Sequence, residues 1–163
     1  LIQDNVIPFI EGEEEKVENE TKKIFGKLTS EGIVQDSEIK VTASCHRVPV
    51  LEGHLIAAFV KLKEQAAIYE IIEVLKKFPV NKIRGLGLPT APDKPVIVRH
   101  ELDRPQPRLD RREGNGMAVV VGRIREDNVL RGVKFVVLGH NTVRGAAGTA
   151  VLIAELALAK NLL

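Results

Sequence analysis

The sequence lacks the features of secreted and membrane proteins. Its single cysteine, Cys45, cannot form an internal disulfide, and no basic N-terminal segment leads into an apolar run with a small-residue cleavage site. The longest apolar run, 146–163, contains Glu155 and Lys160 and is shorter than the roughly 20 clean apolar residues that a bilayer requires. These absences predict a cytoplasmic protein with no membrane partner.

An excess of charge of one sign is also missing, because 24 Lys and Arg face 22 Asp and Glu, a net charge of +2. Such a chain has no strong field that would gather nucleic acid. One segment, 99–112, is rich in arginine, but acidic residues are interleaved with the arginines and no Phe, Tyr or Trp is present to stack on a base. We interpret it as an ion-pair network at a subunit or domain contact, and predict no nucleic-acid partner.

What is present is a chain of 163 residues, 44% hydrophobic and 28% charged, which is enough for one globular domain with a core. Periodicity predicts a helix that starts at the acidic run 13–15 and stops before Gly32, a second one that ends before Pro79, and a last one over 142–162. Strands are expected at 38–47, 54–62, 96–99, 117–124 and 133–138, with the first two paired as a hairpin. The fold class is therefore α+β, an open, mainly antiparallel or mixed sheet with helices packed on it.

The stretch SCHRVPVLEGH, residues 44–54, holds the inventory of a nucleophilic enzyme. Cys45 and His46 are adjacent on a predicted strand and point to opposite faces, so they form no dyad, and Cys45 is more simply a core residue. Arg47 and His54 would face each other at the mouth of the hairpin, where a guanidinium can hold an anion and an imidazole can move a proton. A surface ion pair and a turn residue are the ordinary alternatives.

Two further patterns stay open at this point. Glu20 and Lys23 lie on one face of the first helix and could bind a zwitterion or a phosphate, although an ordinary helical ion pair is the simpler interpretation. In HNTVRGAAG, residues 140–148, small residues at a helix start favour either an anion at the free N–H groups or tight packing through Gly145 and Ala146. No metal site is predicted.

Five stretches, taken in order, resemble aspartate-semialdehyde dehydrogenase of the archaeal and fungal type: NVIPFIEGEEEKVENETKKI, HRVPVLEGH, LPTAPDKPVIV, RPQPRLDRREGNGMAVVVGRIRED and GHNTVRGAAGTAVLIAELA. The resemblance implies a substrate-binding and dimerisation domain over 1–139, with the fold of the C-terminal domain of glyceraldehyde-3-phosphate dehydrogenase. Residues 140–163 would form the helix that returns to an N-terminal NADP-binding domain. The family's glycine-rich loop and nucleophilic cysteine lie in a segment upstream of this chain, and Cys45 does not match that nucleophile.

The resemblance also implies a reaction and a set of roles. The family interconverts L-4-aspartyl phosphate and L-aspartate 4-semialdehyde plus phosphate with NADP, through a cysteine thioester, in the biosynthesis of lysine, threonine and methionine. His54 would be the acid/base, and three residues would contact the substrate: Arg47 its carboxylate, Glu20 its amino group and Lys23 its phosphate. Asn141 would contact the cofactor. This chain alone is expected to be inactive and to form a homodimer or homotetramer.

Two rival functions remain. N-acetyl-γ-glutamyl-phosphate reductase is related in fold and chemistry, but it should lack the RPQPRLDR stretch and handle a longer, acylated substrate. A non-catalytic dimerisation module is the alternative from another class.

Overall fold

The computed structural model describes residues 2–78 and 85–163, and the chain divides into two compact units, Leu1–Val50 and Leu51–Leu163. The second holds the sheet and most of the buried apolar side chains: Met117, Ala118, Val120, Val121, Val133 and Leu138. Within the described residues, no helix has the length and apolar character needed to cross a bilayer.

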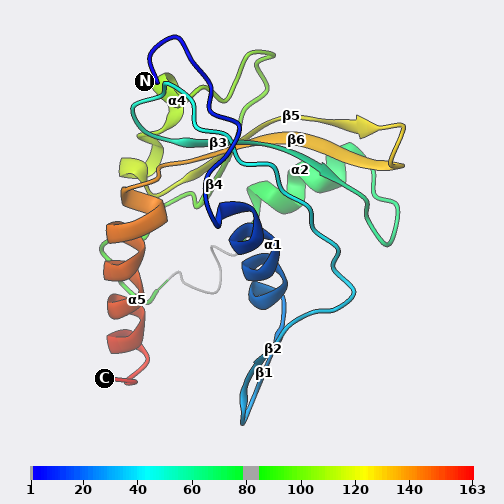
Figure 1. Cartoon of the computed structure of the whole chain (residues 1–163). Coiled ribbons are helices and arrows are strands. Elements are labelled where there is room, and N and C mark those ends of the chain that lie inside the picture. Colours follow the sequence, from blue (N-terminus) through cyan, green and yellow to red (C-terminus); the bar gives the residue numbers. More distant parts are fainter. Residues whose placement is uncertain (1, 79–84) are drawn as a thin grey trace. The chain divides into compact units, whose positions relative to one another are not determined.

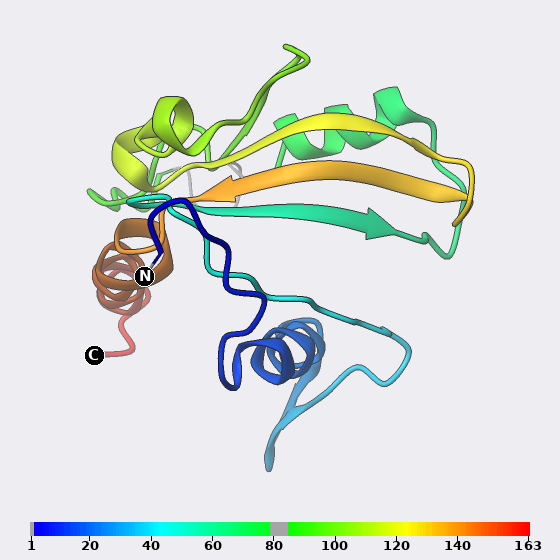
Figure 2. The same cartoon turned by 45° about the horizontal axis from the view of Figure 1, so that its top comes forward.

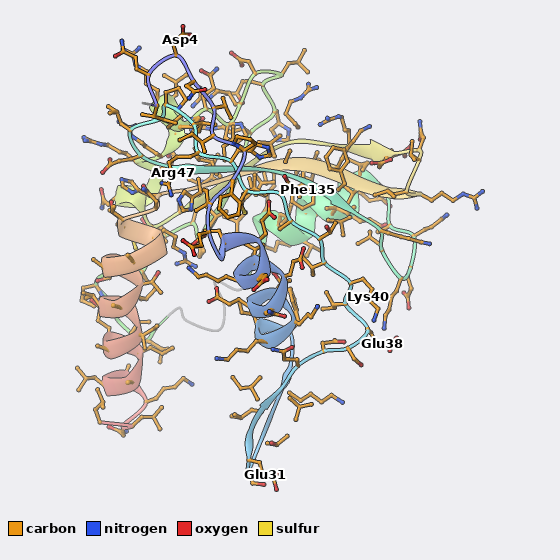
Figure 3. The ribbon with its side chains drawn as sticks, in the orientation of Figure 1. Asp4, Glu31, Glu38, Lys40, Arg47 and Phe135 are labelled. Carbon is orange, nitrogen blue, oxygen red and sulfur yellow. The ribbon has the colours of Figure 1, made fainter. Side chains whose placement is uncertain are left out.

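The first unit consists of helix α1 (Glu13–Ile24) and a hairpin of β1 (Lys27–Thr29) and β2 (Gly32–Val34). Acidic residues fill the first turn of α1 and lysines the last, so both ends of the helix dipole are complemented. The helix ends before Gly26, where a Cβ atom would overlap the backbone carbonyl of Val34. The sequence-based prediction that this helix runs on toward Gly32 is wrong. Glu31 lies at the tip of the hairpin that replaces its last turns (Figure 3).

The extended segment 38–46 also differs from prediction, because it belongs to no strand. The predicted alternation of its two faces is confirmed, since residues 39, 41, 43 and 45 are half-buried and the residues between them are exposed. Two of its N–H groups, however, donate to carboxylates of α1: Ala43 to Glu18 Oε1 at 2.9 Å, and Cys45 to Glu14 Oε1 at 2.8 Å. These side chains occupy donors that a neighbouring strand would have used, so the predicted hairpin with 54–62 does not form.

The sheet of the second unit has the strand order β3-β6-β5-β4, formed by β3 (His54–Val60), β6 (Gly132–Gly139), β5 (Val119–Asp127) and β4 (Val96–Val98). The three long strands lie side by side in Figure 2 and pair antiparallel, whereas β4 pairs parallel to β5. Helix α2 (Ile68–Lys76) packs against β4 and β5. The predicted α+β class with an open mixed sheet is confirmed, as is the predicted helix that ends before Pro79.

The chain then leads through two short helices, α4 (Pro107–Asp110) and η1 (Glu113–Gly116), into β5 and β6 (Figure 1). After β6 come a π-helical turn, η2 (Val143–Ala147), and α5 (Gly148–Ala159). The predicted helix over 142–162 is thus present, but its first turn is π-helical and its α-helical part ends at Ala159. Exposed apolar side chains are found along α5, among them Val151, Ile153 and Leu158.

Candidate functional site

His54 is the first residue of β3, and its side chain is exposed. It pairs with Gly139, the last residue of β6, so the antiparallel register carries the preceding residues, Glu52 and Gly53, alongside His140 and Asn141. The imidazole of His54 has no hydrogen-bond partner among the described residues. A ring that is exposed and uncommitted can exchange protons with a bound ligand.

Side chains continue the β3–β6 pairing beyond its last backbone pair. The Gly53 N–H donates to Asn141 Oδ1 at 3.0 Å, and Arg111 Nη1 donates to the Glu52 carbonyl at 3.4 Å. His140 is buried, and its Nε2 lies 3.4 Å from Glu52 Oε2. The roles of Glu52 and His140 were missed by the sequence analysis. The signal that could have found them is their position next to the paired strands β3 and β6. That pairing was not predicted from the sequence.

Arg47, labelled in Figure 3, lies in the first unit. It forms an isolated antiparallel bridge with Ile7, with backbone N···O distances of 2.9 and 3.0 Å. The predicted pairing of Arg47 and His54 across a hairpin is wrong, because the strand partner of His54 is Gly139 and the bridge partner of Arg47 is Ile7. The Arg47 side chain is exposed and forms no ion pair among the described residues. Its guanidinium therefore keeps all its donors for an anion.

Glu20 and Lys23 line an open hollow of about 480 Å³ between α1 and the β1–β2 hairpin. Ile24, Gly26, Leu28 and Ile33 line the rest of it. The simpler interpretation of Glu20 and Lys23, an ion pair with each other, is not what the structure has: within the described residues neither forms one. An acid and a base therefore face a partly apolar hollow, a combination that suits a small zwitterion or phosphate ester.

Cys45 does not have the properties of a nucleophile. Burial, together with the carboxylates of Glu14 and Glu13, raises the pKa of its thiol. The reactive thiolate is therefore disfavoured at neutral pH. Across the described residues, no group of three His, Cys, Asp or Glu could hold a metal ion.

The start of the C-terminal helices offers few free donors for an anion. Val143 N–H donates to His140 Nδ1, and Gly145 N–H donates to the His140 carbonyl. Ala147 N–H donates to the Thr142 carbonyl. Packing explains the small residues better, although the close contact is at Gly148, where a Cβ would overlap Met117 Sδ, and not at Gly145. The Oδ1 of Asn141, the predicted cofactor contact, is bonded to Gly53, whereas its Nδ2 has no partner among the described residues.

The arginine-rich segment forms an ion-pair network around Asp110, which is fully buried. Arg99 Nε donates to its Oδ1 at 3.1 Å, Arg104 Nε to its Oδ2 at 2.7 Å, and the Gln106 N–H to Oδ2 at 2.7 Å. Burial acts to raise the pKa of Asp110, but these hydrogen bonds and the two positive charges outweigh it and hold the pKa below the ordinary value. The predicted ion-pair network is thus present, with a buried carboxylate at its centre.

Comparison with known proteins gives consistent matches. Residues 1–144 match the family model "Semialdehyde dehydrogenase, dimerisation domain". Aspartate-semialdehyde dehydrogenase of Archaeoglobus fulgidus is 52% identical over 99% of this chain and 45% of its own length. The chain therefore spans less than half the length of such relatives.

The solved structures that resemble this chain include enzymes of the same name. The crystal structure of aspartate semialdehyde dehydrogenase with NADP from Candida albicans has a TM-score of 0.87 and 44% identity, over 99% of this chain and 46% of that one. The structure of aspartate semialdehyde dehydrogenase II complexed with ASA from Vibrio cholerae has a TM-score of 0.75 and 29% identity, over 95% of this chain and 41% of that one.

Proposed function

The chain belongs to the semialdehyde dehydrogenase family, because its residues 1–144 match the model of that family's dimerisation domain. On that premise we propose that it is the substrate-binding and dimerisation part of an NADP-dependent aspartate-semialdehyde dehydrogenase. The complete enzyme would interconvert L-4-aspartyl phosphate and L-aspartate 4-semialdehyde plus phosphate. The observation that carries the proposal is 52% identity over 99% of the chain to an enzyme of that name.

The site residues fit the chemistry of this substrate, which has a cationic amine, two anionic ends and an electrophilic carbon between them. His54, exposed and without a hydrogen-bond partner in the described part of the chain, would move the proton of the nucleophilic thiol and that of the tetrahedral oxygen at the reacting carbon. Arg47 would hold the carboxylate by two parallel hydrogen bonds. Glu20 and Lys23, which line the hollow beside α1, would contact the amino group and the phosphate.

NADP, when bound, supplies the hydride chemistry, and the Candida albicans relative was solved with NADP. In this chain Asn141 fits a cofactor contact, because its Nδ2 donor is unused by the described residues while its oxygen is engaged. Most of the NADP site would belong to the family's N-terminal domain. The segment 140–163 would pack on that domain, a role that fits the apolar side chains Val151, Ile153 and Leu158, which are 52–62% exposed.

Dimerisation is supported by the edge strand β3, on which Leu55, Ile56 and Phe59 are 50–60% exposed. An exposed apolar edge strand is a ready site for association. The number of subunits, two or four, would be set by further contacts of the complete protein. Residues 1–139 would form this substrate-binding and dimerisation part.

The function is tested by assaying the complete gene product and the isolated chain side by side. We expect the complete protein to reduce NADP in the presence of L-aspartate 4-semialdehyde and phosphate. The isolated chain should give no turnover above background yet should elute as a dimer or tetramer in size-exclusion chromatography with light scattering. Turnover with the N-acetyl-γ-glutamyl substrate alone would favour the reductase rival, and an inactive complete protein would favour a dimerisation module.

The carboxylate-binding role of Arg47 predicts a selective effect on substrate binding. Replacing Arg47 with Lys keeps the charge but removes the planar two-point grip. In the complete enzyme, we expect the KM for L-aspartate 4-semialdehyde to rise about 10-fold while kcat changes much less, a loss on the order of one charge-assisted hydrogen bond. Arg108→Lys, which changes an exposed arginine of α4, is the matched control. An unaltered KM in Arg47→Lys would contradict the role.

A further inference from the structure

We propose that Asn141 and the Glu52–His140 pair are positioning residues for His54, because they fix the backbone that leads into it. The inference rests on the proposed function for its catalytic meaning, but its geometry stands on the second unit alone. Four residues make up what we call the His54 clamp: Glu52, Gly53, His140 and Asn141.

The first half of the clamp is the hydrogen bond that Gly53 N–H donates to a side chain, because no strand carbonyl is available to it. The β3–β6 ladder ends at the pair His54 and Gly139, so Gly53 N–H has no strand carbonyl as a partner. Asn141 Oδ1 takes that place at 3.0 Å. Gly53 adopts φ +108, and a Cβ there would lie 3.2 Å from Leu138 Cδ1. The backbone one residue before His54 is thus held in a conformation that favours glycine and packs closely against β6.

The second half is the buried imidazole of His140. Its Nδ1 accepts a hydrogen bond from the Val143 N–H at 3.4 Å, and an amide N–H can only donate. With Nδ1 as the acceptor of that bond, Nε2 is the ring nitrogen left to donate, and it lies 3.4 Å from Glu52 Oε2. The ring joins Glu52 to the first turn of η2. Both residues before His54 are in this way tied to the segment that follows β6.

His54 itself has no such restraint, because its ring is exposed and has no hydrogen-bond partner in the described part of the chain. The position of its Cα–Cβ bond, from which the ring reaches out, is then set by the backbone of residues 52–54. An acid/base must lie within hydrogen-bond reach of the proton that it moves, and a displacement of about 1 Å can reduce rates about 100-fold. The clamp would supply this placement without touching the substrate.

The experiment compares Asn141→Ala with Asn141→Asp in the complete gene product, with Asn128→Ala as a control in the exposed turn after β5. Aspartate keeps an acceptor oxygen for Gly53 N–H, whereas alanine does not. We expect Asn141→Ala to speed hydrogen exchange of the Gly53 amide about 10-fold and to lower kcat about 10-fold, with the KM for L-aspartate 4-semialdehyde nearly unchanged. Asn141→Asp should restore the protection of Gly53 and recover most of the lost kcat at saturating NADP.

Each other result overturns the inference. Unchanged Gly53 exchange in Asn141→Ala would remove the hydrogen bond on which the clamp depends. Faster exchange with full kcat would show that the clamp does not position His54. If Asn141→Asp fails as badly as Asn141→Ala while the KM for NADP rises, Asn141 acts as a cofactor contact and not as a clamp. Should the complete protein lack dehydrogenase activity, the proposed function fails, and Gly53 exchange alone decides whether the clamp exists.

Discussion

Replacing His54 with alanine in the complete enzyme should lower kcat by about 10²–10⁴-fold, the usual cost of losing a general acid/base. The side chain is exposed at the start of β3 and has no hydrogen-bond partner among the described residues. Its removal therefore breaks no described interaction and leaves the fold intact. The KM for L-aspartate 4-semialdehyde should change little, because the substrate carboxylate is assigned to Arg47. Steady-state kinetics in both directions, with circular dichroism of the variant, would measure both effects.

The control for this change is His100→Ala, since His100 is also exposed and follows β4. Its loss should leave turnover near the wild-type value. Added imidazole should partly restore activity to His54→Ala, because a small base can occupy the space left by the ring and move the same proton. Undiminished turnover in His54→Ala would remove His54 from its catalytic role, and low turnover without rescue by imidazole would indicate a structural one.

Replacing Asp110 with alanine should produce a large loss of stability, about 2–3 kcal/mol in the free energy of unfolding, just below the roughly 3–5 kcal/mol that breaking a fully buried ion pair costs. The carboxylate is fully buried and neutralises Arg99 and Arg104, whose side chains are only 24% and 20% exposed. Without it, the Arg104 guanidinium and the Gln106 N–H lose their acceptor. The Arg99 guanidinium keeps only its bond to Glu113 among the described residues. Partial exposure of the two arginines keeps the effect below that of a fully buried charge. Urea unfolding followed by circular dichroism would measure it.

Asp103→Ala is the matched control, because Asp103 lies in the same segment but is exposed, and among the described residues its side chain accepts only from Gln106 Nε2, at 3.1 Å. Its removal should change the free energy of unfolding by less than about 1 kcal/mol. Equal losses in the two variants would contradict a special role for the buried carboxylate.

The same carboxylate makes stability depend on pH in a stated direction. Folding lowers the pKa of Asp110 below its ordinary value of 3.8. The folded state therefore favours the ionised form, so its contribution is fully present above about pH 4 and is lost as the pH falls through the lower, folded-state pKa. The difference in unfolding free energy between the wild type and Asp110→Asn should be constant from pH 7 to about 5 and shrink below about 4. A difference that grew on acidification would have the wrong sign.

Several features of this protein were determined by the sequence itself. The acidic start of α1, the apolar spacing of α2 and the β-rich runs of β4, β5 and β6 each predicted an element that the structure contains. The alternating burial of residues 39–45 was also correct. These properties depend on neighbours within a few positions, and helical or strand periodicity reports them directly. The five quoted stretches identified the family by residue identity.

The tertiary structure alone decided which groups become partners. The pattern of 39–45 reports an extended chain with one covered face, but not that Glu14 and Glu18 of a helix occupy its N–H groups. For the same reason the run 54–60 pairs with β6, far along the sequence, and not with the nearer segment. The contacts of Glu52 and Gly53 with His140 and Asn141 follow from that pairing. The choice of Asp110 as the one buried acid of its segment is likewise a property of the folded chain. Such contacts depend on which donors and acceptors, distant in the sequence, meet in the folded chain. A local sequence pattern carries no information about that outcome.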